Sequence, residues 1–106
     1  MNNLNRINSD ELRILRNDIK LNKLMEAMNI HTKFTEGYWR FVCPKCSEMN
    51  TSVNPKNNLG RCFRCCINYN TIDIVMSYKG YDFRQTIGLL REIHKAIKHA
   101  KMETSN

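Results

Sequence analysis

The sequence lacks any run of apolar residues long enough to cross a membrane, because no stretch approaches the roughly 18 consecutive apolar residues of a transmembrane helix. It also lacks a secretory signal, since Met1 is followed by Asn-Asn-Leu-Asn and not by basic residues and then an apolar segment. These two absences predict a cytoplasmic protein without membrane contact.

Two arrangements of catalytic residues are missing as well. Nucleotide polymerisation needs a cluster of carboxylates that holds two magnesium ions. The 10 Asp and Glu residues here are scattered and form no D-x-D pair in an apolar strand. A glycine-rich phosphate loop is also absent. We therefore expect no catalytic residues and no enzymatic activity from the chain on its own.

The length of 106 residues is that of one domain. Residues 9–101 are expected to form this single domain, between a flexible N-terminus at 1–8 and a flexible tail at 102–106. Both a free-standing protein and a fragment of a longer chain are compatible with this length.

Positive charge is concentrated around the cysteines. The net charge is +7, from 17 Lys and Arg against 10 Asp and Glu. Between Gly37 and Ile72 the only acidic residue is Glu48. The basic residues of that segment are Arg40, Lys45, Lys56, Arg61 and Arg64. A polyanion such as nucleic acid is the partner that this distribution favours.

Residues 9–29 and 70–100 show helical periodicity. The first segment predicts two short helices or one kinked helix, with Ser9 as a cap and Asn17-Asp18 as a second cap. The second predicts one helix from Asn70 to Lys79, which Gly80 ends, and another from about residue 82 to 100. Asp82 and Gln85 form a capping-box-like start for this last helix.

Residues 30–69 are rich in β-branched and aromatic residues and in turn signals. Strands are predicted at about 31–35 and 38–42 around a Glu36-Gly37 turn, with two more around a Pro-Lys-Asn-Asn turn. The expected fold is a small α+β domain, in which N-terminal and C-terminal α-helices flank a short antiparallel β-sheet.

Four of the five cysteines form two C-x-x-C pairs separated by fifteen residues: Cys43, Cys46, Cys62 and Cys65. This spacing is typical of a four-cysteine zinc site, in which four thiolates close every coordination position and make one Zn²⁺ structural. A redox dithiol is the less favoured interpretation. A single iron, which also suits four thiolates, would indicate electron transfer.

The residues that follow each pair are Ser47 and Cys66, where glycine is common because the backbone tends toward positive φ. We therefore expect altered local geometry. The favoured interpretation of Cys66 is an ordinary small residue, and the alternatives are a further metal ligand or an oxidation-sensitive thiol. His31, His94 and His99 are interpreted as surface or packing residues, because four cysteines suffice for zinc.

Several segments together resemble the N-terminal zinc-binding domain of bacterial DnaG-type primases, over roughly Ile19 to Ile93. The segments that carry this resemblance are Cys43-Pro44-Lys45-Cys46, Asn54-Pro55-Lys56, Cys62-Phe63-Arg64-Cys65, Ile72-Asp73-Ile74-Val75-Met76 and Phe83-Arg84-Gln85-Thr86. The helical segment in register behind the second cysteine pair makes the resemblance specific.

The resemblance implies a zinc ribbon that contacts single-stranded template DNA and assists primer initiation by a separate polymerase domain. The chain departs from the family at Cys46, which replaces a histidine, in a loop about two residues shorter, and at Cys66, Asn68 and Tyr69, where the family is usually glycine-rich. A free-standing protein of this kind would act beside a primase or polymerase of a mobile element.

Single-strand binding needs a basic groove with aromatic faces on which bases stack. The candidate residues are Tyr38, Arg40, Lys45, Lys56, Arg61, Phe63 and Arg64. Because strand residues alternate between faces, Trp39 and Phe41 are expected to share a core face, opposite Tyr38, Arg40 and Val42. Alternatively, the aromatic residues are core and the basic residues a solvated face.

A second candidate function is protein docking in the regulation of replication or transcription. Its docking face would be the apolar stripe from Phe83 to Ile97.

Overall fold

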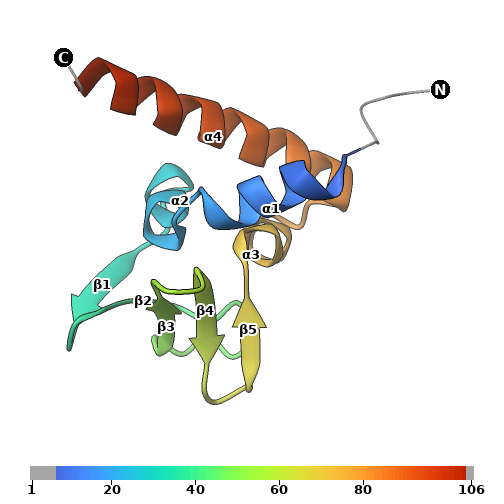
Figure 1. Ribbon diagram of the computed structural model, residues 1–106. Helices are drawn as coiled ribbons and strands as arrows, with labels where there is room; N and C mark the ends of the chain where they lie inside the picture. The colour runs from blue at the N-terminus through green and yellow to red at the C-terminus, as the bar shows by residue number, and fades with distance from the viewer. Residues whose placement is uncertain (1–6, 105–106) are drawn as a thin grey trace.

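The computed structural model describes residues 7–104, with side chains described up to residue 100. Figure 1 shows its helices gathered on one side of a five-stranded antiparallel sheet, which confirms the predicted α+β fold class. The helices are α1 (Ser9–Asn17), α2 (Leu21–Ala27), α3 (Thr71–Lys79) and α4 (Phe83–Thr104). The strands are β1 (Thr32–Thr35), β2 (Tyr38–Phe41), β3 (Thr51–Asn54), β4 (Leu59–Cys62) and β5 (Ile67–Tyr69).

The sheet is a meander in which strand order follows chain order, from β1 to β5. The predicted β1–β2 turn is confirmed, because Glu36 and Gly37 both have positive φ, 55° and 85°. Strand β5 has no counterpart in the sequence prediction, because three residues directly after a cysteine pair are too few to show a strand period.

One face of the sheet is packed against the helices. Phe41 lies fully buried on this face, in one core with Leu24 of α2 and Ile74 of α3. Gly60 of β4 leaves room for the Phe41 ring, since a Cβ at position 60 would lie 2.8 Å from Phe41 Cζ. A glycine is therefore required at this close approach.

Trp39 is on the same side of the sheet as Phe41 but lies outside this core. It is 37% exposed and packs edge-to-face on Phe34, with ring centroids 5.1 Å apart. The prediction that Trp39 is a core residue is wrong, because the β1–β2 hairpin extends past the edge of the helical layer, as Figure 1 shows.

The N-terminal cap of helix α1 lies one residue earlier than predicted. The cap is Asn8, whose side-chain oxygen accepts a hydrogen bond from the Glu11 amide at 2.7 Å, and Ser9 is the first helical residue. Two separate helices follow each other, but the predicted second cap at Asn17-Asp18 is wrong. The residue at the cap position of α2 is Lys20, which makes no side-chain capping bond.

Asn58, in the turn between β3 and β4, supplies the missing cap from a distance. Its Oδ1 accepts from the Leu21 amide at 3.0 Å, at the start of α2. Its Nδ2 donates to the carbonyl oxygens of Arg16 at 2.7 Å and Ile19 at 2.8 Å, at the end of α1. One buried amide thus satisfies both helix ends and fixes the helices to the sheet.

Helix α3 ends as predicted and begins at Thr71, one residue later than predicted, because Asn70 is its cap. Asn70 and Asp73 form a reciprocal capping box, and Gly80 ends the helix in the left-handed conformation at φ 68°.

Helix α4 starts with the predicted reciprocal bonds, Asp82 N to Gln85 Oε1 at 3.0 Å and Gln85 N to Asp82 Oδ1 at 2.8 Å. It continues to Thr104, four residues past the expected end, so residues 102–104 of the predicted tail are helical. Residues 1–6 of the predicted flexible N-terminus and residues 105–106 lie outside the described residues.

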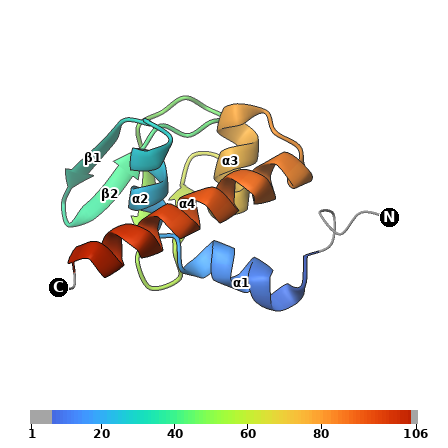
Figure 2. The same cartoon turned by 90° about the horizontal axis from the view of Figure 1, so that it is seen from above.

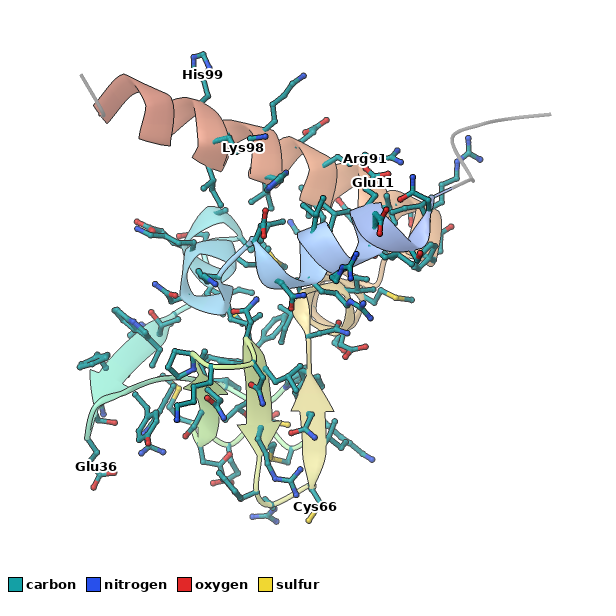
Figure 3. All side chains as sticks on the ribbon, viewed as in Figure 1. Glu11, Glu36, Cys66, Arg91, Lys98 and His99 are labelled. Carbon is teal, nitrogen blue, oxygen red and sulfur yellow. The ribbon has the colours of Figure 1, made fainter. Side chains whose placement is uncertain are left out.

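Helix α4 lies across the helical layer, with α1 on one side and α2 and α3 on the other (Figure 2). Its apolar stripe faces inward, because Ile87, Leu90 and Ile93 are buried. The Arg91 guanidinium binds both carboxylate oxygens of Glu11 in α1, at 2.7 and 2.9 Å (Figure 3). The hydrogen bond from Arg91 lowers the pKa of Glu11.

None of the described helices is long and apolar enough to cross a membrane.

We predict that Asn58→Gly lowers the free energy of unfolding by about 3 kcal/mol, because the replacement leaves three buried backbone groups without their partner. Glycine keeps the positive φ of 57° at this position without strain. Urea unfolding of the metal-loaded protein measures the change. Asn57→Gly, at an exposed neighbour with one local hydrogen bond, is the control and should cost less than about 1 kcal/mol. Equal effects of the two substitutions would contradict the role of Asn58.

Candidate metal centre and open sheet face

Each cysteine pair forms a tight turn at the end of a strand. Cys43 follows β2 and Cys62 ends β4. The first turn is closed by the Ser47 amide, which donates to the Cys43 carbonyl at 2.9 Å, and the second by the Cys66 amide, which donates to the Cys62 carbonyl at 2.8 Å. The two turns therefore have matching backbone hydrogen bonds.

The expectation of altered geometry after each pair is wrong. Ser47 and Cys66 adopt the left-handed conformation that glycine favours, with φ of 64° and 59°. A non-glycine residue in this region costs roughly 1–2 kcal/mol. The closed turn imposes this conformation on whichever residue follows the pair.

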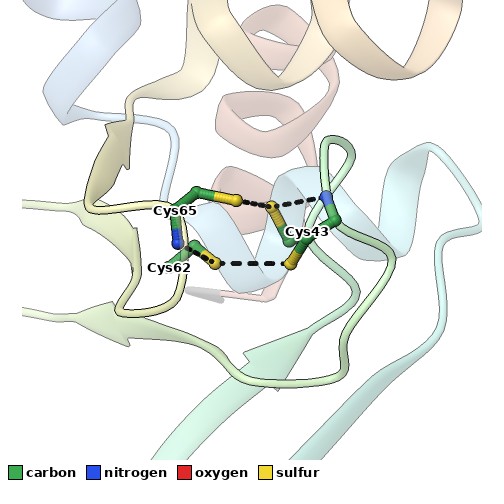
Figure 4. A group of neighbouring side chains, drawn as sticks. Cys43, Cys62 and Cys65 are labelled. Atoms are coloured by element: carbon green, nitrogen blue, oxygen red, sulfur yellow. Dashed lines mark hydrogen bonds between the residues drawn. The ribbon is translucent and has the colours of Figure 1, made fainter.

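Backbone amides in these turns point at the sulfur atoms. The Lys45 and Cys46 amides donate to Cys43 Sγ at 3.4 and 3.5 Å, and the Cys65 amide donates to Cys62 Sγ at 3.4 Å. Figure 4 shows the two turns facing each other across the cluster. Donors around a sulfur favour its ionised form, which is the form that binds a metal.

The structure brings the four predicted cysteines together, with their sulfur atoms all within 4.8 Å of one another. The Cys43–Cys65 sulfur distance is 3.9 Å and the Cys46–Cys62 distance is 3.7 Å. A tetrahedron with metal–sulfur bonds of about 2.3 Å has edges of about 3.8 Å. The four sulfurs therefore fit one tetrahedral ion. Each of the two short distances joins a sulfur of the first turn to a sulfur of the second.

Two tyrosines tie the first turn to neighbouring elements. The Tyr69 hydroxyl of β5 lies 3.3 Å from Cys43 Sγ, and the Tyr78 hydroxyl of α3 donates to the carbonyl of Val42 beside it. Burial raises the pKa of Tyr78 to about 12. Neither contact could be predicted from the sequence, because both join residues that lie more than 25 positions apart.

The sulfur cluster holds its thiols in unequal protonation states. Burial alone would raise the pKa of Cys43, but hydrogen bonds from the Tyr69 hydroxyl and from two backbone amides lower it to about 6. Burial, reinforced by the neighbouring sulfurs, raises the pKa of Cys65 to about 12. Although a backbone hydrogen bond from Glu48 lowers the pKa of Cys46, burial and the nearby sulfurs outweigh it and raise that pKa overall.

Cys66 and the histidines lie outside the cluster. Cys66 is exposed at the tip of the second turn, where its thiol donates to the Phe63 carbonyl at 3.6 Å (Figure 3). His94 lies 3.6 Å from Asp18, between α4 and the end of α1. The other two, His31 and His99, are exposed.

The sheet face opposite the helices carries a row of polar residues that crosses four strands. Arg40, Ser52, Arg61 and Asn68 are successive cross-strand partners from β2 to β5. This open face is hollowed into a groove of about 540 Å³. The residues that line it are Tyr38, Arg40, Ser52, Val53, Asn54, Lys56, Asn57, Leu59, Arg61, Phe63 and Asn68.

Five of the seven candidate nucleic-acid residues line this groove: Tyr38, Arg40, Lys56, Arg61 and Phe63. The other two, Lys45 and Arg64, lie in the cysteine turns and do not line it. Strand alternation places Tyr38, Arg40 and Arg61 on this face, whereas Lys56 and Phe63 reach the groove from turns that flank β4. Nothing in the sequence marked the three asparagines of the groove, Asn54, Asn57 and Asn68.

The arginines of the groove are fixed in place by neighbouring side chains. Arg40 donates to Thr35 Oγ1 at 2.9 Å, to Ser52 Oγ at 2.9 Å and to Glu36 Oε1 at 3.0 Å. Arg61 donates to Asn68 Oδ1 at 3.3 Å, and its guanidinium lies 5.5 Å from the centre of the Phe63 ring. Phe63 itself is 67% exposed. The groove thus presents preorganised positive charge beside an accessible aromatic face.

A family model described as the CHC2 zinc finger matches residues 7–105 of the chain. No curated protein and no solved structure matches the chain. The name of the matching family describes a Cys-His-Cys-Cys ligand set, whereas this chain has Cys46 at the position of the histidine.

We predict that Cys66→Ser retains one bound metal ion per chain, because its thiol points away from the cluster. Cys65→Ser should lose the four-thiolate site. Elemental analysis and the visible absorption of the Co²⁺-loaded variants distinguish the two results. Loss of metal from Cys66→Ser alone would show that the ligand set is assigned wrongly.

We predict that Zn²⁺ binding to the metal-free protein at pH 7 releases at least two protons, because raised pKa values keep Cys46 and Cys65 protonated while the ion requires thiolates. Metal affinity should therefore fall as the pH is lowered. A pH indicator in weakly buffered solution counts the protons. Release of fewer than two protons per ion would contradict the protonated states of Cys46 and Cys65.

Proposed function

Because the chain belongs to the CHC2 zinc-finger family, the zinc ribbon of DnaG-type primases, we propose that it is a zinc-dependent DNA-binding protein. In this proposal it contacts single-stranded template and assists primer synthesis or replication by a separate polymerase. The groove on the open face of the sheet is the observation that carries the proposal, since it gathers five residues suited to a single strand.

We propose that Cys43, Cys46, Cys62 and Cys65 hold one structural Zn²⁺. The sulfur distances support this assignment, and so does the family to which the chain belongs. Four thiolates leave no open coordination position for a substrate. The ion, when bound, supplies folding energy by joining the two turns that end β2 and β4.

The path proposed for the strand crosses the open sheet face. Exposed Tyr38 and Phe63 offer ring faces on which bases stack. Arg40 of β2 and Arg61 of β4 line the same groove on either side of Ser52 in β3. No carboxylate lines the groove in the described part of the chain, so nothing there repels the phosphates. Glu36, at the β1–β2 turn, lies outside the groove lining and binds Arg40 at 3.0 Å.

Lys45 and Arg64 are proposed to extend this positive surface along the cysteine turns. Arg64 lies 3.8 Å from Glu48, and both side chains are well exposed, so the pair contributes little to stability and Arg64 remains accessible to phosphate. Both residues are expected to affect affinity less than the residues of the groove.

The proposed role is non-catalytic. Residues 9–101 act as one primase-like zinc-ribbon domain in the cytoplasm, and a separate primase or polymerase, in the same chain or another, carries out synthesis.

The alternative function is protein docking. The middle of the stripe from Phe83 to Ile97 is buried at Ile87, Leu90 and Ile93, while Phe83 at its start is exposed. The exposed Phe34–Trp39 pair is the observation that still favours docking. Capture of a polymerase by the wild-type chain without DNA, and its loss in Phe34→Ala, would support this alternative.

The colour of the purified protein distinguishes a four-thiolate iron site, which would carry out electron transfer, from the proposed zinc site. We expect a colourless protein that contains one equivalent of zinc by elemental analysis, and a coloured protein that contains iron would overturn the structural role.

We predict that Phe63→Ala weakens binding of a single-stranded oligonucleotide by roughly 1–3 kcal/mol, because a stacking face is lost. Arg61→Ala should weaken binding and reduce the slope of log K against log salt concentration by about 1. Fluorescence anisotropy across a salt series measures both effects.

Phe34→Ala is the matched control, since Phe34 is an exposed aromatic residue on the opposite face of the sheet. It should leave affinity unchanged. Equal losses in the Phe63 and Phe34 variants, or binding that does not depend on salt, would contradict the proposed groove.

A further inference from the structure

The proposed metal centre carries more negative charge than the name of its family implies. Four thiolates around a divalent cation leave a net charge of minus two, whereas three thiolates and a neutral imidazole leave minus one. The extra charge comes from Cys46. Because Cys43 and Cys62 are fully buried, this charge needs hydrogen-bond donors from the protein.

Backbone amides supply some of these donors, and one side chain adds another. The Tyr69 hydroxyl lies 3.3 Å from Cys43 Sγ, and Tyr69 is only 6% exposed. A metal-bound thiolate has no proton to donate, so the hydroxyl is the donor of this bond. Asn50 also lies near a ligand, with its Oδ1 at 3.6 Å from Cys62 Sγ. An amide oxygen accepts a hydrogen bond from a thiol and does not stabilise a thiolate.

The fold aims the Tyr69 hydroxyl at the opposite turn. Tyr69 ends β5, the strand that follows the second cysteine pair, and it pairs with Gly60 of β4 on the core face. Its side chain reaches Cys43 in the first pair, so the bond spans the two turns that share the proposed ion.

We propose that Tyr69 is a positioning residue of the metal centre, whose hydroxyl donates to the Cys43 thiolate and offsets the charge of the fourth cysteine. This assignment rests on the proposed zinc site and goes beyond it, since it names the residue that sets the affinity and electronic character of the site. Partners of metal ligands of this kind typically change metal affinity 10- to 100-fold when they are removed.

The test compares Tyr69→Phe with Tyr78→Phe in the full chain loaded with Co²⁺. Both substitutions delete one hydroxyl near the cluster, but the Tyr78 hydroxyl binds the Val42 carbonyl and not a sulfur. Loss of a donor makes the Cys43 thiolate a better electron donor. Tyr69→Phe should therefore move the sulfur-to-cobalt charge-transfer band to longer wavelength and weaken Zn²⁺ binding by about tenfold in chelator competition.

Tyr78→Phe should leave the band at the wild-type wavelength. A band at that wavelength in Tyr69→Phe, or equal shifts in the two variants, would overturn the role of Tyr69 while leaving the metal site intact. A wild-type chain that takes up no Co²⁺ or Zn²⁺ would overturn the metal centre itself.

A second measurement covers the case in which Tyr69→Phe does not fold. Wild-type protein in which all tyrosines are replaced by 3-fluorotyrosine has more acidic hydroxyls, which donate stronger hydrogen bonds. Its charge-transfer band should move to shorter wavelength, and the same labelling of Tyr78→Phe should give the same shift. An unmoved band in the labelled wild-type protein would overturn the proposal.

Discussion

The convergence of four sulfur atoms at the ends of β2 and β4 is the constraint on which the rest of this small domain depends. Buried sulfurs less than 5 Å apart cannot all be ionised unless a cation and hydrogen-bond donors share their charge. The closed turns, the amides that point at Cys43 and Cys62, and the Tyr69 hydroxyl all supply such donors. The geometry of the open sheet face follows, because the same turns set the ends of its central strands.

The two faces of the sheet have different tasks because successive strand residues point to opposite sides. Phe41 packs under the helices, while its neighbour Arg40 lies in the groove. Helices cover only one face, so the residues that suit a nucleic acid remain accessible without loss of core packing. The exposed Phe34–Trp39 pair marks the limit of this cover at the β1–β2 hairpin.

Local signals in the sequence were enough for most of the fold and for the composition of the metal cluster. The C-x-x-C spacing, the Glu36-Gly37 turn and the Asp82–Gln85 cap each act within a few residues and can be recognised from neighbours alone. Contacts between distant residues could not be predicted in this way. Asn58 caps α2 from a turn 37 positions along the chain, and Tyr69 reaches Cys43 across 26 positions. Neither residue type nor spacing distinguishes them from ordinary turn and strand residues.

The meander has a consequence for how the domain assembles. Each strand pairs only with its neighbours along the chain, so every ladder of the sheet closes over a short connection. Such local pairing gives a low contact order, which is associated with fast folding. The contacts of longest sequence separation join the helices, as between Arg91 and Glu11 and between Thr71 and Leu15. Asn58 joins the helices to the sheet, so the hairpins can form one after another before the helices dock. Docking of the helical layer, and not formation of the sheet, is then the step with the largest loss of chain entropy.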